Sequence, residues 1–325
     1  MTASAAPQSR IGLAGHMNEL SLLAAIVVLY VVFASTANGF MTFYNQINIL
    51  RDAATIGIAA WAATLIIISG EIDVSTGPMV AFISVILAYF LQWGVPTLPA
   101  FLLVLAAGGL LGGVAGALRA WFDVPSFVAT LGLWSALRGL SLYFTDALPV
   151  SIGRNPIVDA LDRPFLGVPP AAILMLLLFA VFLFVSRKTA FGRSVYAVGG
   201  NPQAAFLAGI NVARVRIMVF VIGGTMAALS GILLLSRLGS GNATAASGLE
   251  FDVIAAVVVG GTALSGGRGS MVGTLLGVLV ITLIGNGLIL LGINPFIQQV
   301  VRGLIIVVAV LANIQAIKRA KARQG

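Results

Sequence analysis

The chain has 325 residues, of which 59% are hydrophobic and only 9% are charged, with a net charge of +8. Its mean hydropathy is +1.08, and a soluble protein carries about a quarter charged residues, so the composition excludes a soluble protein and predicts an integral membrane protein. The absence of cysteine excludes disulfides, iron–sulfur clusters and thiol chemistry. Because the basic residues stand at span boundaries and in a tail, without interleaved aromatics, we expect a lipid bilayer as partner and no nucleic acid.

The first apolar run, Leu20–Ala37, follows a polar N-terminal tail over residues 1–19. Two interpretations are open: an uncleaved membrane span, or a signal peptide with Ala34–Ala37 as its cleavage region. We favour the span, because the run is long for the apolar part of a signal peptide and its flank carries one arginine.

The remaining apolar stretches predict nine further spans, since about twenty apolar residues cross a bilayer as a helix. Gly94, Pro96 and Pro99 divide one long uncharged stretch into a hairpin. The eighth span is the shortest and runs into Gly260-Gly261. The nine spans are about 48–68, 77–92, 98–118, 125–144, 165–186, 215–235, 251–265, 270–291 and 296–314. The expected fold is therefore all-α, with about ten transmembrane helices in one domain over 20–317 and a basic tail over 318–325.

The distribution of arginine and lysine orients these spans. Ten crossings place both termini on one side, and most basic residues outside the spans lie on that side, in the loop over 187–214 and in the C-terminal tail. An excess of basic residues marks the cytoplasmic face. Both termini and this loop are therefore predicted to be cytoplasmic.

The loop over 187–214 carries the signals of a short helix. Asn201 can cap a helix N-terminus by accepting bonds from free backbone N–H groups. Pro202 suits the first helical position, where no N–H is needed, and Gly209 allows the chain to leave the helix with a positive φ. The sequence predicts a helix of about two turns over Pro202–Ala208.

Three stretches, together and in order, resemble one family. They are Ile68-Ser-Gly-Glu-Ile-Asp-Val-Ser-Thr-Gly77, the loop over Thr189–Val212, and Val259-Gly-Gly-Thr-Ala-Leu-Ser-Gly-Gly-Arg-Gly269 followed by Gly273-Thr274. A looser match is Thr130-Leu131-Gly132 with Arg138-Gly139-Leu140. The chain resembles, from about residue 40 to 314, the permease subunits of bacterial ABC importers for monosaccharides of the ribose/xylose/arabinose type. It departs from the family signature Gly-Gly-Ile-Asp-Leu-Ser-Val-Gly at Glu71, which replaces the second glycine.

The resemblance implies a type II ABC importer-like permease whose central loop forms a coupling helix that docks on an ATP-hydrolysing subunit. Asn201 and Pro202 would set the start of this helix, small alanines would allow close approach, and Gly209 would end it. The alternative is an ordinary interfacial loop helix. The candidate coupling residues are Gly192, Arg193, Gly199, Gly200, Asn201, Pro202, Ala204, Ala205, Ala208 and Gly209.

Three residues near a predicted cytoplasmic span end, Glu71, Asp73 and Ser75, are candidates for gating the pathway or contacting the partner. The alternative is that Asp73 or Ser75 caps the next helix. We favour the cap for Asp73 and leave the role of Glu71 open.

Polar residues inside or near the outer ends of spans are candidates for the pathway. Arg138 and Arg302 could line or gate an outer cavity, or could extend to the headgroups. Asn286 and Gln298, with Gln299, could contact a sugar hydroxyl, although such residues more often bond between helices. The same question arises for tryptophans that could stack on a sugar but more often anchor at the interface, namely Trp61, Trp121 and Trp134.

The sequence has no nucleophile–base constellation, metal-ligand spacing or Gly-x-x-x-x-Gly-Lys-Ser/Thr loop. We therefore expect no enzyme activity, no metal and no cofactor in this chain, with ATP-Mg used by a partner ATPase. The resemblance implies a bacterial inner-membrane protein that pairs with a second copy as a homodimer and receives its sugar from a periplasmic binding protein. The alternatives are the same machinery for a branched-chain amino acid, nucleoside or signalling molecule, an ion-coupled secondary transporter, and an intramembrane enzyme. An ion-coupled transporter would need titratable groups near mid-membrane, and the predicted spans hold essentially none there.

Overall fold

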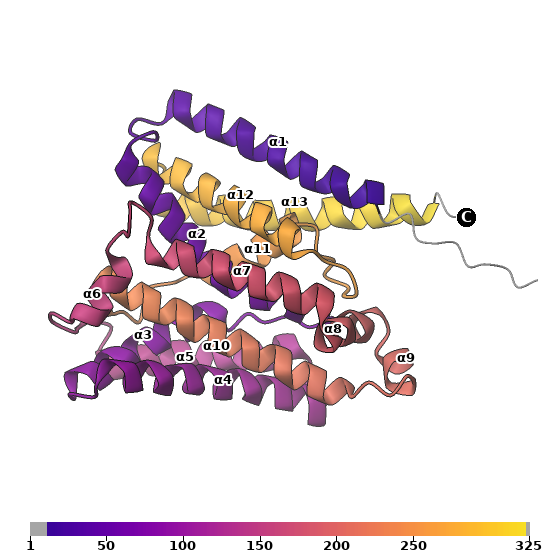
Figure 1. Ribbon diagram of the computed structural model, residues 1–325, viewed down its shortest axis with the longest axis horizontal. Helices are drawn as coiled ribbons and strands as arrows, with labels where there is room; N and C mark the ends of the chain where they lie inside the picture. Colours follow the sequence, from indigo (N-terminus) through magenta and orange to yellow (C-terminus); the bar gives the residue numbers. More distant parts are fainter. Residues whose placement is uncertain (1–11, 323–325) are drawn as a thin grey trace, which may run out of the picture.

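The computed structural model describes residues 12–322, and within them the chain folds into helices joined by short loops, with one pair of two-residue strands (Figure 1). The predicted tails over 1–19 and 318–325 lie partly outside the described residues. The elements are α1 (Gly12–Thr36), α2 (Phe43–Ile68), α3 (Thr76–Gln92), α4 (Thr97–Trp121), α5 (Ser126–Thr145), β1 (Val150–Ser151), α6 (Pro156–Asp162), α7 (Pro170–Lys188), α8 (Ala190–Gly200), α9 (Pro202–Leu207), α10 (Val212–Leu238), β2 (Ser240–Gly241), α11 (Leu249–Val259), α12 (Met271–Leu290) and α13 (Pro295–Ala322).

Each of the ten predicted spans coincides with a helix, but their lengths differ. Among the described residues, seven helices are long and apolar enough to cross a membrane, namely α1, α2, α4, α5, α7, α10 and α12. Helix α3 and the apolar part of α13, Pro295–Val308, are shorter. Helix α11 has 11 residues, so at 1.5 Å per residue it reaches about 16 Å, half of the hydrocarbon core. It ends before Gly260 and Gly261, and Gly261 adopts a φ of +91°. The count of ten crossings stays a prediction.

Helix α2 forms the centre of the molecule. It packs against α7, α10, α11 and α12, and most of its side chains are buried. Trp61 is buried among them and donates its indole N–H to the carbonyl of Met175, 3.2 Å away. The expectation that Trp61 anchors at the membrane interface or stacks on a sugar is therefore wrong: it is a core residue.

Glycines allow α4 and α10 to pack closely along much of their length. A Cβ placed at Gly112 would lie 2.1 Å from the carbonyl oxygen of Phe220, and one placed at Gly108 would lie 2.5 Å from that of Gly224. Small residues four apart let helix backbones approach in this way in lipid.

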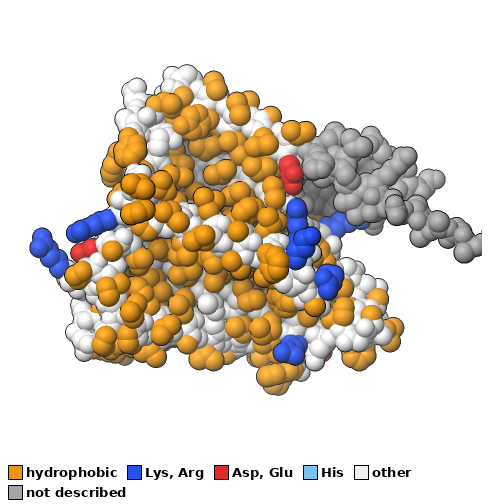
Figure 2. All heavy atoms as spheres, in the orientation of Figure 1, with side chains coloured by type: hydrophobic (Ala, Val, Ile, Leu, Met, Phe, Trp, Pro, Cys, Tyr) orange, Lys and Arg blue, Asp and Glu red, His pale blue; other side chains and the backbone are white. Residues whose placement is uncertain are grey.

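The two ends of the helix bundle differ. Helix α6 lies at one end, whereas α8 and α9 lie at the other, together with the start of α1 and the end of α13 (Figure 1). Strand β1 pairs antiparallel with β2. Figure 2 shows a face covered by hydrophobic side chains between these ends, with lysine and arginine gathered at each end. This pattern is the one expected for a protein surrounded by lipid at its middle.

Candidate functional site

The loop over 187–214 contains two short helices. Asn201 ends α8, where its backbone N–H donates to the carbonyl of Ala197. Its side chain caps α9 by accepting from the backbone N–H groups of Gln203 and Ala204, each at 3.0 Å. Pro202 is the first residue of α9, and Gly209 leaves it with a φ of +82°. The predicted cap and start of this helix are thus present. Helix α8 was not predicted, although Thr189, whose hydroxyl accepts from the N–H of Gly192 at 3.1 Å, is an N-cap signal.

The side chains of α9 divide between the protein and the solvent. Ala205 is only 4% exposed and therefore packs against its own chain, which corrects the expectation that it offers a surface for close approach. Ala204 and Ala208 are exposed. Phe206 and Leu207 are 69% and 81% exposed. Neither residue stands out in the sequence, because apolar residues are common throughout the chain.

The ends of three segments meet beside α8, in a group that we call the glycine junction: Ile68, Gly70, Gly199, Gly266 and Gly267. The N–H of Gly267 donates to the carbonyl of Ile68 at 2.8 Å. A Cβ placed at Gly199 would lie 1.7 Å from that same carbonyl oxygen, and one placed at Gly266 would lie 2.8 Å from the carbonyl oxygen of Gly199. The backbones are in direct contact, so no larger residue fits at Gly199.

The glycine junction joins the three sequence stretches that carried the family resemblance. Gly70 lies in the loop between α2 and α3, Gly199 near the end of α8, and Gly266 in the loop between α11 and α12. Tyr196 strengthens the contact by donating its hydroxyl to the carbonyl of Gly269 at 2.9 Å. A phenol is already protonated at neutral pH, and burial raises the pKa of the Tyr196 phenol further, so this hydroxyl is a neutral donor. The end of α8 is thus in direct backbone contact with the loop after α2 and the loop after α11.

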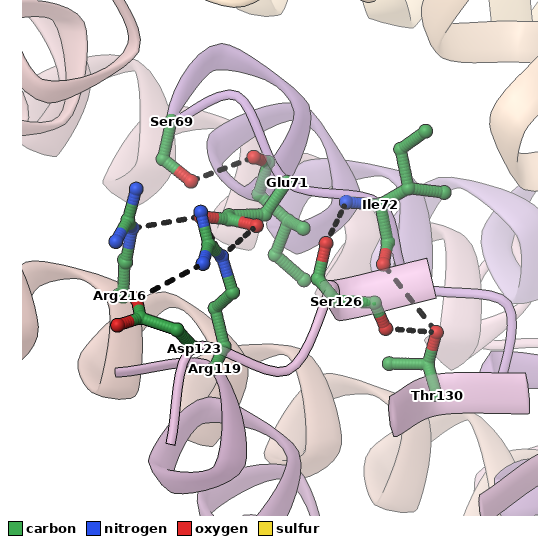
Figure 3. Close-up of polar contacts among 9 residues, drawn as sticks. Ser69, Glu71, Ile72, Arg119, Asp123, Ser126, Thr130 and Arg216 are labelled. Atoms are coloured by element: carbon green, nitrogen blue, oxygen red, sulfur yellow. Dashed lines mark hydrogen bonds and ion pairs between the residues drawn. The ribbon is translucent and has the colours of Figure 1, made fainter. Parts of the chain in front are cut away.

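A buried carboxylate lies next to the glycine junction. Glu71 is 3% exposed, and both of its carboxylate oxygens accept from Arg119 Nε, at 2.9 and 3.0 Å. Arg216 Nε lies 2.7 Å from Glu71 Oε1, and Asp123 pairs with Arg119 at 3.5 Å (Figure 3). We call Glu71, Arg119, Arg216 and Asp123 the Glu71 cluster. It ties the loop between α2 and α3 to the end of α4 and the start of α10. A role of Glu71 in gating the pathway or contacting the partner stays a prediction.

The rest of this loop is held by its own carboxylate and by hydroxyls from α5. Asp73 accepts from the N–H and the hydroxyl of Ser75, at 2.8 and 2.6 Å. It closes the turn before α3, and Ser75 is the N-cap residue without a side-chain cap bond, so the prediction of a helix cap by Asp73 or Ser75 is corrected. The hydroxyl of Ser126 accepts from the N–H of Ile72 at 3.1 Å (Figure 3). The hydroxyl of Thr130 accepts from the N–H of Val74 at 3.2 Å.

The predicted polar candidates at the outer ends of the helices have partners within the chain. Arg138 donates to the carbonyl of Ala243, and so is tied to the loop after β2. Trp134 donates to Glu250 at 2.9 Å. Asn286 exchanges two hydrogen bonds with Asn45, at 2.8 and 3.0 Å. This confirms the prediction that Asn286 forms hydrogen bonds between helices. Gln298 donates to the carbonyl of Ile293 at 2.8 Å.

Three of these candidates, Arg302, Asn286 and Gln298, line one cavity of about 260 Å³ between α2, α10, α11, α12 and α13. Arg302 pairs with Asp252 at 3.2 Å. A second ion pair in the wall joins α2 to α10 through Asp52 and Arg237. Among the described residues, no three His, Cys, Asp or Glu side chains lie close enough together to hold a metal ion.

Comparison with known proteins identifies the wider relationship. Residues 45–310 match the family described as branched-chain amino acid transport system / permease component. The chain is 69% identical to the probable ABC transporter permease protein YphD of Escherichia coli K12 over 94% of the chain and 92% of that protein. It is 41% identical to the ribose import permease protein RbsC of Bacillus subtilis (94% and 96%), and 32% identical to the xylose transport system permease protein XylH of E. coli K12 (91% and 91%). No solved structure matches the chain.

Proposed function

The chain belongs to the family of branched-chain amino acid transport system permease components, and we propose that it forms the translocation pathway of an ATP-driven importer for a monosaccharide or related polyol. It is a multi-pass protein of the inner membrane. Relatives named for ribose and xylose transport align over nearly their whole length, which favours a pentose, a hexose or a related polyol over the amino acids of the family description.

The glycine junction is the observation that carries the proposal. A transporter powered by a separate subunit needs a rigid element at the membrane surface, with a stiff connection to the loops that line its pathway. Helix α9 presents Phe206 and Leu207 to the solvent. Helix α8 contacts the loops after α2 and α11 through the backbone at Gly199 and through the Tyr196 hydroxyl. The energy source is therefore a partner ATPase that docks on α9, and this chain hydrolyses no ATP.

The proposal places about ten crossings in the bilayer, with both termini and α9 in the cytoplasm. A second copy of the chain forms a homodimer around the pathway, and a periplasmic binding protein delivers the solute at the opposite end. Two observations support this orientation. Most arginines and lysines outside the predicted spans lie in the loop over 187–214 and in the tail over 318–325, and the end of α13 lies on the same side as α9 (Figure 1).

Replacing Leu207 with aspartate tests the docking of the ATPase. Because Leu207 is exposed at the tip of α9, Leu207→Asp leaves the fold intact but places a charge in an apolar contact, and we expect recovery of the ATPase with the tagged chain to fall at least about tenfold. Co-purification from membranes in mild detergent measures this. The matched control is Leu166→Asp, at an 89% exposed residue near α6 at the opposite end. Equal recovery of the ATPase with both variants would contradict docking at α9.

The orientation can be tested with single cysteines, because the chain has none of its own. We expect a membrane-impermeant thiol reagent added outside intact spheroplasts to label Leu166→Cys but not Leu207→Cys, since the two positions lie at opposite ends of the bundle. Both positions should be labelled after the membrane is opened by detergent. The reverse pattern in intact cells would place α9 outside and overturn the orientation.

A further inference from the structure

The cavity beside Arg302 has the properties of a binding site. Its volume of about 260 Å³ lies just below the range of about 300–1,000 Å³ typical for drug-sized ligands, so it suits a smaller molecule. It is bounded by helices from both halves of the chain, from α2 to α13. Aliphatic side chains such as Ile56 and Ile281 form much of its wall.

The charged groups of the cavity balance one another. Asp52 pairs with Arg237, and Asp252 pairs with Arg302, so the four charged side chains that line the cavity sum to zero. A net charge on the ligand would find no unpaired counter-charge there. Each pair nevertheless presents carboxylate acceptors beside guanidinium donors, which is the combination that a hydroxyl group, itself a donor and an acceptor, can satisfy.

One polar atom of the wall lacks a partner in the protein. Thr282 is 3% exposed and lines the cavity, and its hydroxyl makes no hydrogen bond. A buried hydroxyl without a partner is unfavourable, so the Thr282 hydroxyl is available to donate to, or accept from, a polar molecule that enters the cavity. The Asn286 amide, held in place by Asn45, lies in the same wall.

We propose that this cavity is a transit subsite for a neutral polyhydroxylated solute of about the size of a monosaccharide, held by the two Asp–Arg pairs, Thr282 and Asn286. The inference rests on the proposed function and deepens it, because it places a solute contact within this chain. A zwitterionic amino acid fits less well, since its charged groups would have to break ion pairs that are already made. The described residues that line the cavity include no aromatic ring, so the site holds its ligand through hydroxyls rather than by stacking, as suits a site that must release it.

Two substitutions test the subsite without removing the ion pairs. A Cβ placed at Gly285, which lines the cavity on α12, meets no heavy atom within 4 Å, so Gly285→Leu begins in open space, adds bulk to the cavity and favours the helix. Thr282→Val removes only the unpartnered hydroxyl. The matched control for Thr282→Val is Thr225→Val on α10, which removes a hydroxyl that bonds to Val221 of the same helix, outside the cavity.

The experiment uses the complete complex with its ATPase and binding protein in liposomes, and it records uptake of labelled D-ribose, D-xylose and L-leucine together with ATP hydrolysis. We expect Gly285→Leu to lower sugar uptake about tenfold and Thr282→Val to lower it about three- to tenfold, the range for one net hydrogen bond. ATP hydrolysis should be unchanged in both variants, and Thr225→Val should take up sugar at the wild-type rate. Sugar uptake at the wild-type rate by both cavity variants would overturn the subsite alone. Uptake of leucine and neither sugar by the wild-type complex would overturn the proposed function, and the polyol subsite with it.

Discussion

Replacing Gly199 with alanine is expected to lower the free energy of unfolding by about 3 kcal/mol or more, and to abolish transport. The added Cβ would lie 1.7 Å from the carbonyl oxygen of Ile68 and 2.7 Å from the nitrogen of Gly267. Both are backbone atoms that cannot rotate away, so relief requires the three segments of the glycine junction to separate. Overpacking by one methyl in a well-packed core costs about 1–3 kcal/mol, and the loss of the Ile68–Gly267 hydrogen bond adds to it.

The neighbouring glycine provides the control. Gly200 is also in α8, and a Cβ placed there meets no heavy atom within 4 Å. We expect Gly200→Ala to change the free energy of unfolding by less than about 1 kcal/mol. The change is an increase if the higher helix propensity of alanine dominates. Chemical denaturation in detergent micelles compares the two variants. If they were equally stable, the close backbone contact at Gly199 would be ruled out.

Replacing Glu71 with glutamine is expected to cost about 3 kcal/mol of the free energy of unfolding. The amide keeps the shape of the side chain but leaves Arg119 and Arg216 without the buried charge that neutralises them. Removing one partner of a buried ion pair costs about 3–5 kcal/mol, and the lower end applies because both arginines are partly exposed. The loop after α2 should loosen from α4 and α10, so that ATP hydrolysis continues while coupled uptake falls.

Asp123 offers the matched control, because it pairs with the same Arg119 from a side chain that is 91% exposed. An ion pair at the surface contributes about 0–1 kcal/mol, so the free energy of unfolding of Asp123→Asn should be close to that of the wild type. Denaturation of both variants under one set of conditions measures the difference. An effect of Asp123→Asn as large as that of Glu71→Gln would show that burial does not set the strength of the Glu71 cluster.

The helices and the cap of α9 were predictable because their signals are local. Apolar runs of the right length mark the spans, and Asn201, Pro202 and Gly209 mark a helix start and end within a few residues. The interhelical role of Asn286 was also predictable, since an amide in an apolar span needs a partner. The partner itself, Asn45, was not, because it lies 241 positions away in sequence.

Features that depend on distant segments could not be predicted. The sequence shows Glu71 as a departure from a glycine pattern, but its two arginine partners come from α4 and α10. Ala205 is buried because of how α9 lies against the rest of the chain. The sequence alone does not distinguish it from its neighbour Ala204, which is exposed. Residues from five helices form the cavity, so no single stretch of sequence predicts that Arg302 and Thr282 both line it.

The most direct test of the central claim is uptake of labelled D-ribose and D-xylose by liposomes that contain the chain with its ATPase and binding protein. We predict that uptake requires ATP in the compartment that α9 faces and does not depend on proton or sodium gradients. Uptake should be lost in Gly199→Ala, which breaks the glycine junction. Uptake by the chain alone, driven by an ion gradient without ATP, would contradict the account.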